Sequence, residues 1–124
     1  MVNDETALPE HVRRNRAHWD EIAVQYVGPG ERAWARTEPT WGLWRVPDTE
    51  LHVLPEALAG KDVIELGCGT AYIAAWLARR GARAVGIDNS AAQLATARRL
   101  QQSMAWNFRQ PDVLFSRDGG VAGG

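Results

Sequence analysis

Apolar residues recur at helical spacing in the N-terminal part of the chain. They fall at i, i+3, i+4, i+7 and i+8, which predicts a helix over residues 10–27 with one apolar stripe. The residues of the stripe are Trp19, Ile22, Ala23, Tyr26 and Val27. The sequence Gly28-Pro29-Gly30 is expected to end this helix. Packing against the rest of the protein is the simplest explanation of the stripe.

Two short apolar runs, at 63–66 and 84–87, predict buried strands. The residues between them predict a helix from 71 that is apolar on nearly every side and ends at Gly81. Ser90-x-x-Gln93 has the pattern of a capping box for another helix over 91–103. Parallel strands joined by helices require right-handed crossovers, so a βαβα unit is predicted here.

The flanking segments are less regular. Residues 31–47 hold Trp34, Trp41 and Trp44, for which an aromatic substrate pocket and plain burial are both open, with burial favoured. Asp48 is expected to cap a short helix over 49–54. A third strand is predicted around 113–115.

Composition excludes several classes of function. A net charge of −1 gives no basic field for nucleic acid. The single cysteine, Cys68, excludes an intrachain disulfide and supplies no metal cluster, so no metal site is predicted. No apolar run approaches the ~18 residues of a membrane span. The N-terminus lacks the pattern of a signal peptide, so a cytoplasmic location is expected.

The strongest candidate chemistry lies where the two predicted strands end. The first strand leads through Gly67 and Gly69 into a helix, and this arrangement lets a ligand lie against bare backbone at a helix N-terminus. The second strand ends at Asp88, the position where such folds hold a ribose.

These residues resemble a known family. Glu65-Leu66-Gly67-Cys68-Gly69-Thr70-Ala71, followed by Val85-Gly86-Ile87-Asp88-Asn89-Ser90, is similar to the class I S-adenosylmethionine-dependent methyltransferases of the type 11-like group. The resemblance implies S-adenosylmethionine as cofactor. The cofactor-binding residues that it implies are Glu65, Gly67, Cys68, Gly69, Asp88 and Asn89.

The resemblance also implies a role for each position. Gly67 and Gly69 let the methionine end approach the backbone, with Cys68 as a small spacer. Glu65 lies near the methionine amine, Asp88 binds the two ribose hydroxyls, and Asn89 lies beside the adenine. The family's third glycine is Ala71 here, whose methyl is expected to crowd the turn or push the helix outward.

Two further positions are implied outside this motif. Trp19-Asp20-Glu21-Ile22-Ala23-Val24-Gln25-Tyr26 fits an aromatic-Asp-x-x-Ala-x-x-Tyr helix that covers the cofactor in many members, which makes Tyr26 a candidate for its methionine end. Asp112 stands where the family places an acid near the adenine amine.

The fold class implied is α/β, a Rossmann-like doubly wound parallel sheet that is truncated. We expect a loose leader at 1–9, a Trp-rich helical cap at 10–60, a partial cofactor-binding domain at 61–115 and a disordered tail at 116–124. The resemblance covers only the first half of the family's seven-stranded domain. We therefore expect an open sheet edge that favours self-association.

The function expected is methyl transfer from S-adenosylmethionine to an unidentified acceptor, with the activity of this short chain doubtful. No catalytic residue is assigned: His11, His18 and His52 lie outside the motif, and a lowered pKa at Cys68 is a minor alternative. A non-catalytic module for an adenosine ligand and a remnant without ligand stay open. Against a dinucleotide, Tyr72 stands where that fingerprint requires glycine or alanine.

Overall fold

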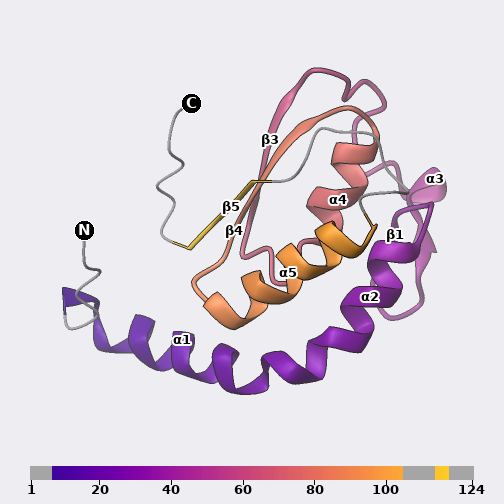
Figure 1. The fold of residues 1–124 in the computed structure, drawn as a ribbon. Helices are drawn as coiled ribbons and strands as arrows, with labels where there is room; N and C mark the ends of the chain where they lie inside the picture. Colours follow the sequence, from indigo (N-terminus) through magenta and orange to yellow (C-terminus); the bar gives the residue numbers. More distant parts are fainter. Residues whose placement is uncertain (1–6, 105–113, 118–124) are drawn as a thin grey trace.

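The computed structural model describes residues 7–104 and 114–117, and these form three layers (Figure 1). A parallel β-sheet forms the first layer, and two crossover helices cover one of its faces. An arm of N-terminal helices packs on the outside of those two helices. The carboxyl ends of the strands therefore lie close to the arm.

The sheet contains β3 (Asp62–Leu66), β4 (Arg83–Ile87) and β5 (Leu114–Ser116), in the order β3-β4-β5. All three strands are parallel. Helix α4 (Tyr72–Arg79) connects β3 to β4, and α5 (Ala91–Met104) follows β4. The predicted βαβα unit and the third strand are thus confirmed, and so is the truncated Rossmann-like fold class.

The register aligns the ends of the strands. Leu66 of β3 pairs with Ile87 of β4, and Ile87 pairs with Ser116 of β5. The loops that follow β3 and β4 therefore leave the sheet at the same level. This brings the turn at residues 67–70, called the glycine turn below, and Asp88 to one edge of the sheet.

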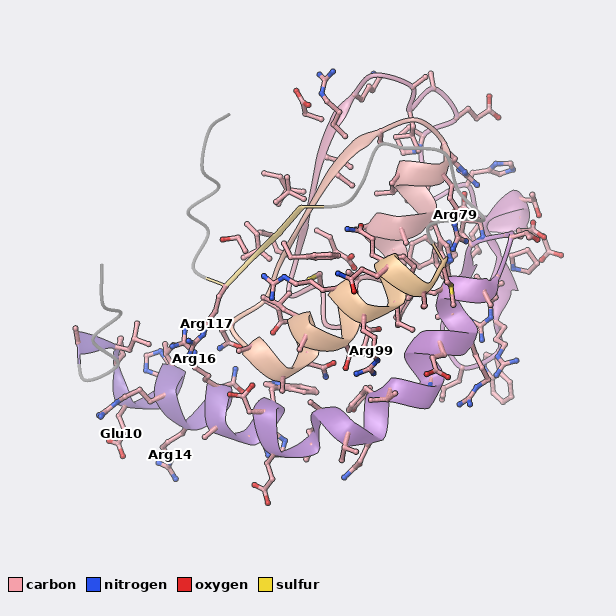
Figure 2. All side chains as sticks on the ribbon, in the orientation of Figure 1. Glu10, Arg14, Arg16, Arg79, Arg99 and Arg117 are labelled. Carbon is pink, nitrogen blue, oxygen red and sulfur yellow. The ribbon has the colours of Figure 1, made fainter. Side chains whose placement is uncertain are left out.

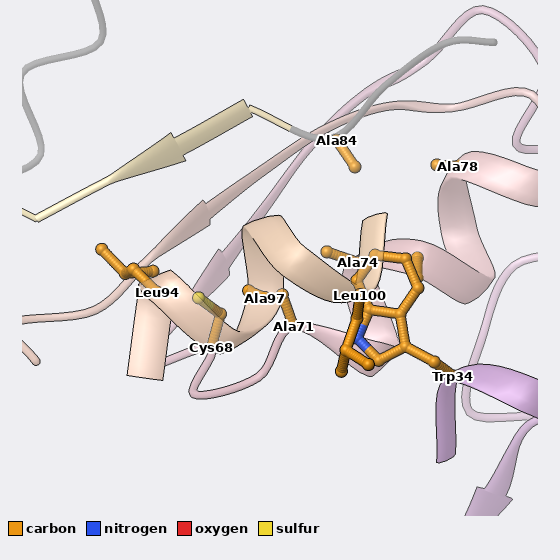
Figure 3. Packing of buried hydrophobic residues seen from close by; sticks show 10 residues of the cluster. Trp34, Cys68, Ala71, Ala74, Ala78, Ala84, Leu94, Ala97 and Leu100 are labelled. Carbon is orange, nitrogen blue, oxygen red and sulfur yellow. The ribbon is translucent and has the colours of Figure 1, made fainter. Parts of the chain in front are cut away.

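The core lies between the sheet and the two crossover helices (Figure 3). It is built from small residues on α4 and α5 with a few large ones between them. The buried members are Trp34, Cys68, Ala71, Ala74, Ala75, Ala78, Ala84, Leu94, Ala97 and Leu100. Many alanines let the helices approach the strands closely, so Trp34 from the arm fills the remaining space.

The prediction that Gly28-Pro29-Gly30 ends the first helix is wrong. The arm consists of α1 (Glu10–Ile22), the 3₁₀ helix η2 (Ala23–Tyr26) and α2 (Val27–Ala35), so helical structure continues through the three residues. Pro29 lies in the first turn of α2, where a backbone N–H has no intrahelical partner and proline costs little. A 3₁₀ turn, rather than a break, therefore redirects the chain.

Two indole groups fasten α2 to the glycine turn and to α4. Trp34 Nε1 donates to the Thr70 carbonyl at 2.6 Å, and Trp76 Nε1 donates to the Ala33 carbonyl at 2.9 Å. Burial, the favoured reading of Trp34, is thus confirmed. Trp44, in contrast, is 89% exposed.

Arg79 adds a third connection between the arm and α4. Its guanidinium lies between α4 and the end of α2 (Figure 2), where it donates to the carbonyls of Trp34 and Arg36. These are carbonyls that the end of α2 leaves without intrahelical partners. One side chain therefore both caps α2 and joins it to the crossover helix.

A small hairpin follows α2, formed by β1 (Thr40–Trp41) and β2 (Val46–Pro47), and it leads into α3 (Asp48–Leu51). Asp48 was expected to cap a helix over 49–54 from outside, but it is the first residue of α3. Its Oδ1 accepts hydrogen bonds from Trp41 Nε1 and from the backbone N–H groups of Val53 and Leu54. The carboxylate therefore ties the hairpin to the chain beyond α3.

β3 is an edge strand of the described sheet, as expected. Ile64 and Leu66 on its outer face are 63% and 78% exposed. No helix in the described ranges is long and apolar enough to cross a membrane. Asp112 and residues 1–6 and 118–124 lie outside the described residues, while Ser116 of the predicted tail belongs to β5.

The seating of α2 on the glycine turn gives a prediction for two glycines of the same helix. A Cβ at Gly30 would lie 2.9–3.0 Å from Thr70 side-chain atoms, whereas a Cβ at Gly28 meets only the end of Arg32 at 3.3 Å. We expect Gly30→Ala to lower the free energy of unfolding by about 1–2 kcal/mol through overpacking. Gly28→Ala should leave it unchanged or raise it by up to about 1 kcal/mol. Urea denaturation of both variants measures this difference, and equal stability would show that α2 is not closely seated.

Candidate functional site

A cavity of about 580 Å³ opens at the carboxyl ends of β3 and β4. Its walls come from the glycine turn, from the residues after β4 and from the arm. The lining residues are Asn15, Trp19, Tyr26, Gly67, Cys68, Gly69, Thr70, Tyr72, Ile87, Asp88, Asn89, Gln93 and Arg117. Five of the six residues implied by the resemblance are among them, and Glu65 is not.

The glycine turn forms one wall of the cavity with bare backbone. Gly67 and Gly69 have φ values of 63° and 57°, in the left-handed region that glycine adopts without strain. A Cβ built at either position would meet no atom within 4 Å, so both face open space. The Cys68 N–H donates to the Ile87 carbonyl at 2.9 Å, which holds the turn against the next strand.

Ala71 occupies the position of the family's third glycine, and it also has a positive φ of 64°. It is fully buried in the core cluster that contains Trp34, and it precedes the first residue of α4. Its methyl group therefore contributes to the core instead of lining the cavity. The left-handed conformation, unusual for a residue with a Cβ, is stabilised by this packing.

The Asp88 carboxylate joins the two strand ends. Its Oδ2 accepts from the Gly69 N–H and its Oδ1 accepts from the Ser90 N–H, both at 2.8 Å. Each carboxylate oxygen has a second lone pair, so Asp88 keeps accepting capacity on the cavity side. The predicted proximity of residue 88 to the Gly67–Gly69 bend is confirmed.

Glu65 lies beneath the turn rather than in the cavity wall. Its Oε1 accepts from the Ala74 N–H at 3.0 Å, one of the first N–H groups of α4 that no backbone carbonyl satisfies. Burial raises the pKa of Glu65 from its ordinary value of 4.5 to about 7. The hydrogen bond from Ala74 opposes this shift, and the charge of Asp88 adds to it.

Cys68 is buried against the sheet. A Cβ at Gly86 would lie 2.9 Å from Cys68 Sγ, so the absent side chain of Gly86 makes room for the sulfur. Burial, with the charges of Glu65 and Asp88 nearby, raises the pKa of the Cys68 thiol to about 12. The alternative of a lowered thiol pKa is therefore wrong.

The arm closes the cavity from outside. Trp19 and Tyr26 line it with their ring centroids 5.8 Å apart, and Asn15 lines it one turn before Trp19 in α1. Arg117, just after β5, also lines the cavity, and Figure 2 shows it at the end of the sheet nearest α1. Tyr26 thus contributes to the wall, and its expected contact with the methionine end of the cofactor stays a prediction.

Asp20 connects the arm to the sheet. Its Oδ1 accepts from Ser90 Oγ at 2.6 Å and from the Ala92 N–H at 3.2 Å, at the start of α5. Sequence reasoning assigned no role to Asp20, although it belongs to the quoted helix motif. Its carboxylate caps α5 from a residue seventy positions away, so no local pattern reveals the contact.

A second hollow of about 560 Å³ lies beside α1. It is lined by His11, Val12, Arg14, Asn15, His18 and Asn89. Asn15 and Asn89 line both hollows. Among the described residues, no three His, Cys, Asp or Glu side chains form a group that fits a metal ion.

Comparison with known proteins finds methyltransferases. A family model described as a methyltransferase domain matches residues 63–117. The ubiquinone biosynthesis O-methyltransferase of Stutzerimonas stutzeri (strain A1501) is 41% identical over 94 residues, which are 73% of this chain and 40% of that protein. The ribosomal RNA small subunit methyltransferase C of Chromohalobacter salexigens is 43% identical over 68 residues, 51% of this chain and 20% of that protein.

A solved structure has a similar fold. It is the phosphoethanolamine N-methyltransferase 1 of Haemonchus contortus in complex with phosphoethanolamine and S-adenosylhomocysteine, with a TM-score of 0.50 and 17% identity. The match covers 93% of this chain and 23% of that one. The chain spans less than half the length of these similar proteins.

The raised pKa of Glu65 predicts a pH dependence of stability. The native state retains this proton up to about pH 7, whereas the unfolded chain releases it near 4.5. The free energy of unfolding should therefore fall as pH rises from about 4.5 to about 7, by at most about 1.4 kcal/mol per pH unit. Denaturation at several pH values measures it, and Glu65→Gln should remove this part of the slope. Glu56→Gln, at an exposed position, is the control and should keep the wild-type profile.

Proposed function

We propose that this chain, whose residues 63–117 match a methyltransferase domain, binds S-adenosylmethionine in its cavity for methyl transfer to an unidentified acceptor. The single observation that carries this proposal is the pairing of the glycine turn with Asp88 at one edge of a parallel sheet. It is supported by the matching family and by the expected positions of five lining residues.

The cavity has the chemistry that this cofactor requires. Gly67 and Gly69 present backbone without side chains, so an extended amino-acid chain has room to lie along the turn. Asp88 accepts hydrogen bonds at the end of β4, which suits a pair of ribose hydroxyls. Asn89 follows Asp88 in the wall and is assigned to the adenine side.

Glu65 supports the site indirectly. Its carboxylate fixes the start of α4 through the Ala74 N–H, and it thereby holds the turn that α4 follows. Its expected contact with the methionine amine stays a prediction. An ammonium group near Glu65 would favour the ionised carboxylate and would oppose the effect of burial.

The bound cofactor would supply an electrophilic methyl group whose leaving group is a neutral thioether. The residues of this chain would position it and limit the access of water, which provides rate through proximity and orientation. Trp19 and Tyr26 present aromatic faces to the cavity, and such faces attract a sulfonium. We assign no general base.

The acceptor is open. The names of the similar proteins refer to ubiquinone biosynthesis, to ribosomal RNA and to phosphoethanolamine. These acceptors differ in size and charge, so the family alone selects none of them. Methyl transfer is a proposal for the whole protein, because this chain spans only part of the length of its relatives. A cytoplasmic location stays a prediction.

A dinucleotide is the less favoured ligand. Tyr72 is the first residue of α4 and lines the cavity, and its ring lies 5.1 Å from that of Trp76. An aromatic ring at this helix start hinders the close approach that a pyrophosphate requires. Tyr72 therefore favours the methionine-bearing ligand.

The role of Asp88 gives a binding prediction. S-Adenosylhomocysteine should bind the wild-type chain, and Asp88→Asn should weaken this binding by roughly 1–3 kcal/mol, because charge-assisted hydrogen bonds to the ribose are lost. Isothermal titration calorimetry measures both affinities. Asp62→Asn is the matched control, since Asp62 is an exposed acid at the opposite end of β3. Absence of heat at millimolar ligand with the wild-type chain would reject the proposed function.

The edge of β3 gives a second prediction, that two copies of the chain associate through it. The backbone of an edge strand offers free hydrogen-bonding groups, and a strand paired with it would bring side chains beside the exposed Ile64 and Leu66. Sedimentation at increasing protein concentration should show dimers that Ile64→Lys weakens. A monomer over the whole concentration range would contradict the prediction.

A further inference from the structure

Gln93 is a buried polar residue of the cavity wall and has no role in the proposed function. Only 3% of its surface is exposed, and it lines the cavity from the first turn of α5. Its Oε1 has no hydrogen-bond partner among residues 7–104 and 114–117. Buried acceptors are almost always satisfied in folded proteins, so an exception inside a ligand cavity requires an explanation.

The explanation lies in the capping box, of which only half is formed. The Gln93 N–H donates to Ser90 Oγ at 3.2 Å, as the sequence pattern predicts. In a complete box the Gln93 side chain would accept from the Ser90 N–H. Here Asp88 Oδ1 accepts from that N–H at 2.8 Å instead. The same carboxylate that joins the strand ends thus leaves Gln93 Oε1 available.

We propose that Gln93 Oε1 accepts a hydrogen bond from the exocyclic amino group of the adenine of the bound cofactor. The inference rests on the proposed function, and it assigns a further contact within the same cavity. It makes Gln93 a specificity-determining residue, since an oxygen acceptor favours a base with an amino group over one with a carbonyl at that position.

Among the hydrogen-bond donors of the ligand, the adenine amino group is the one that fits Gln93 Oε1. The two ribose hydroxyls have one donor each, and both are assigned to Asp88. The methionine end is assigned to the turn that leads into α4, whereas Gln93 lies on α5, the helix after Asp88 and Asn89. The base is the part of the ligand left for α5, and its amino group is the donor. It has two N–H bonds, so one of them is enough for Gln93.

The test uses the full 124-residue chain and a near-isosteric apolar replacement. Gln93→Met removes the unsatisfied oxygen, so the ligand-free variant should unfold at an equal or higher temperature than wild type. Its affinity for S-adenosylhomocysteine should fall about tenfold, equivalent to about 1.4 kcal/mol. Gln102→Met, at an exposed position of the same helix, is the matched control and should change neither quantity.

The deaminated analogue S-inosylhomocysteine, with a carbonyl in place of the amino group, identifies the atom that Gln93 contacts. The wild-type chain should bind it about tenfold more weakly than S-adenosylhomocysteine. In Gln93→Met this preference should fall to less than about threefold, because the acceptor that reads the amino group is absent.

Each other outcome overturns the proposal in a recognisable way. Lower stability of ligand-free Gln93→Met would show that its oxygen is already satisfied within the protein. Unchanged affinity would remove the contact, and an equal loss for both ligands would move it away from the amino group. Failure of the wild-type chain to bind S-adenosylhomocysteine would reject the proposed function itself, before any variant is compared.

Discussion

The hydrogen bonds that the Asp88 carboxylate accepts from two backbone N–H groups determine the geometry of the site. One N–H belongs to the glycine turn after β3, and the other belongs to Ser90, the residue before α5. Parallel register brings these groups to the same level of the sheet, and the carboxylate then fixes their separation. Charge-assisted bonds of this kind are among the stronger hydrogen bonds in proteins. The shape of the turn and the start of α5 therefore depend on the same side chain.

This interaction extends to the arm through Ser90. The Ser90 N–H donates to Asp88, while its hydroxyl group donates to Asp20 of α1. The arm is held again at α2, where Trp34 donates to the Thr70 carbonyl. Hydrogen bonds thus join the arm to the loops after β3 and β4 at two places, Asp20 and Trp34, in addition to the apolar contacts between helices.

The sequence predicts those parts of the molecule whose signals are local or periodic. Periodicity predicts the strands around Val63 and Val85 and the apolar face of α5. The motif at 65–71 and 85–90 predicts the residues that line the cavity at the strand ends. Errors occur where a distant partner decides. Gly28-Pro29-Gly30 has the pattern of a helix end, yet α2 continues through it because Trp34 and Gly30 pack against the turn.

The capping box at 90–93 shows the same limit within four residues. Its backbone half forms as the pattern predicts, and its side-chain half does not, because Asp88 takes the Ser90 N–H. Glu65 is a comparable case, because its place in the motif does not reveal that its carboxylate caps α4. Residue type and spacing specify which groups are near the turn, but competition among acceptors decides which hydrogen bonds form.

The close approach of Gly86 to Cys68 has a consequence for how this sequence is able to change. The sulfur occupies the volume that a methyl group on residue 86 would require, with 2.9 Å between the two positions. A bulkier residue at position 68 or 86 would push the glycine turn away from β4. Substitutions at these two positions are therefore coupled, so a homologue with alanine at 86 requires a smaller side chain at 68.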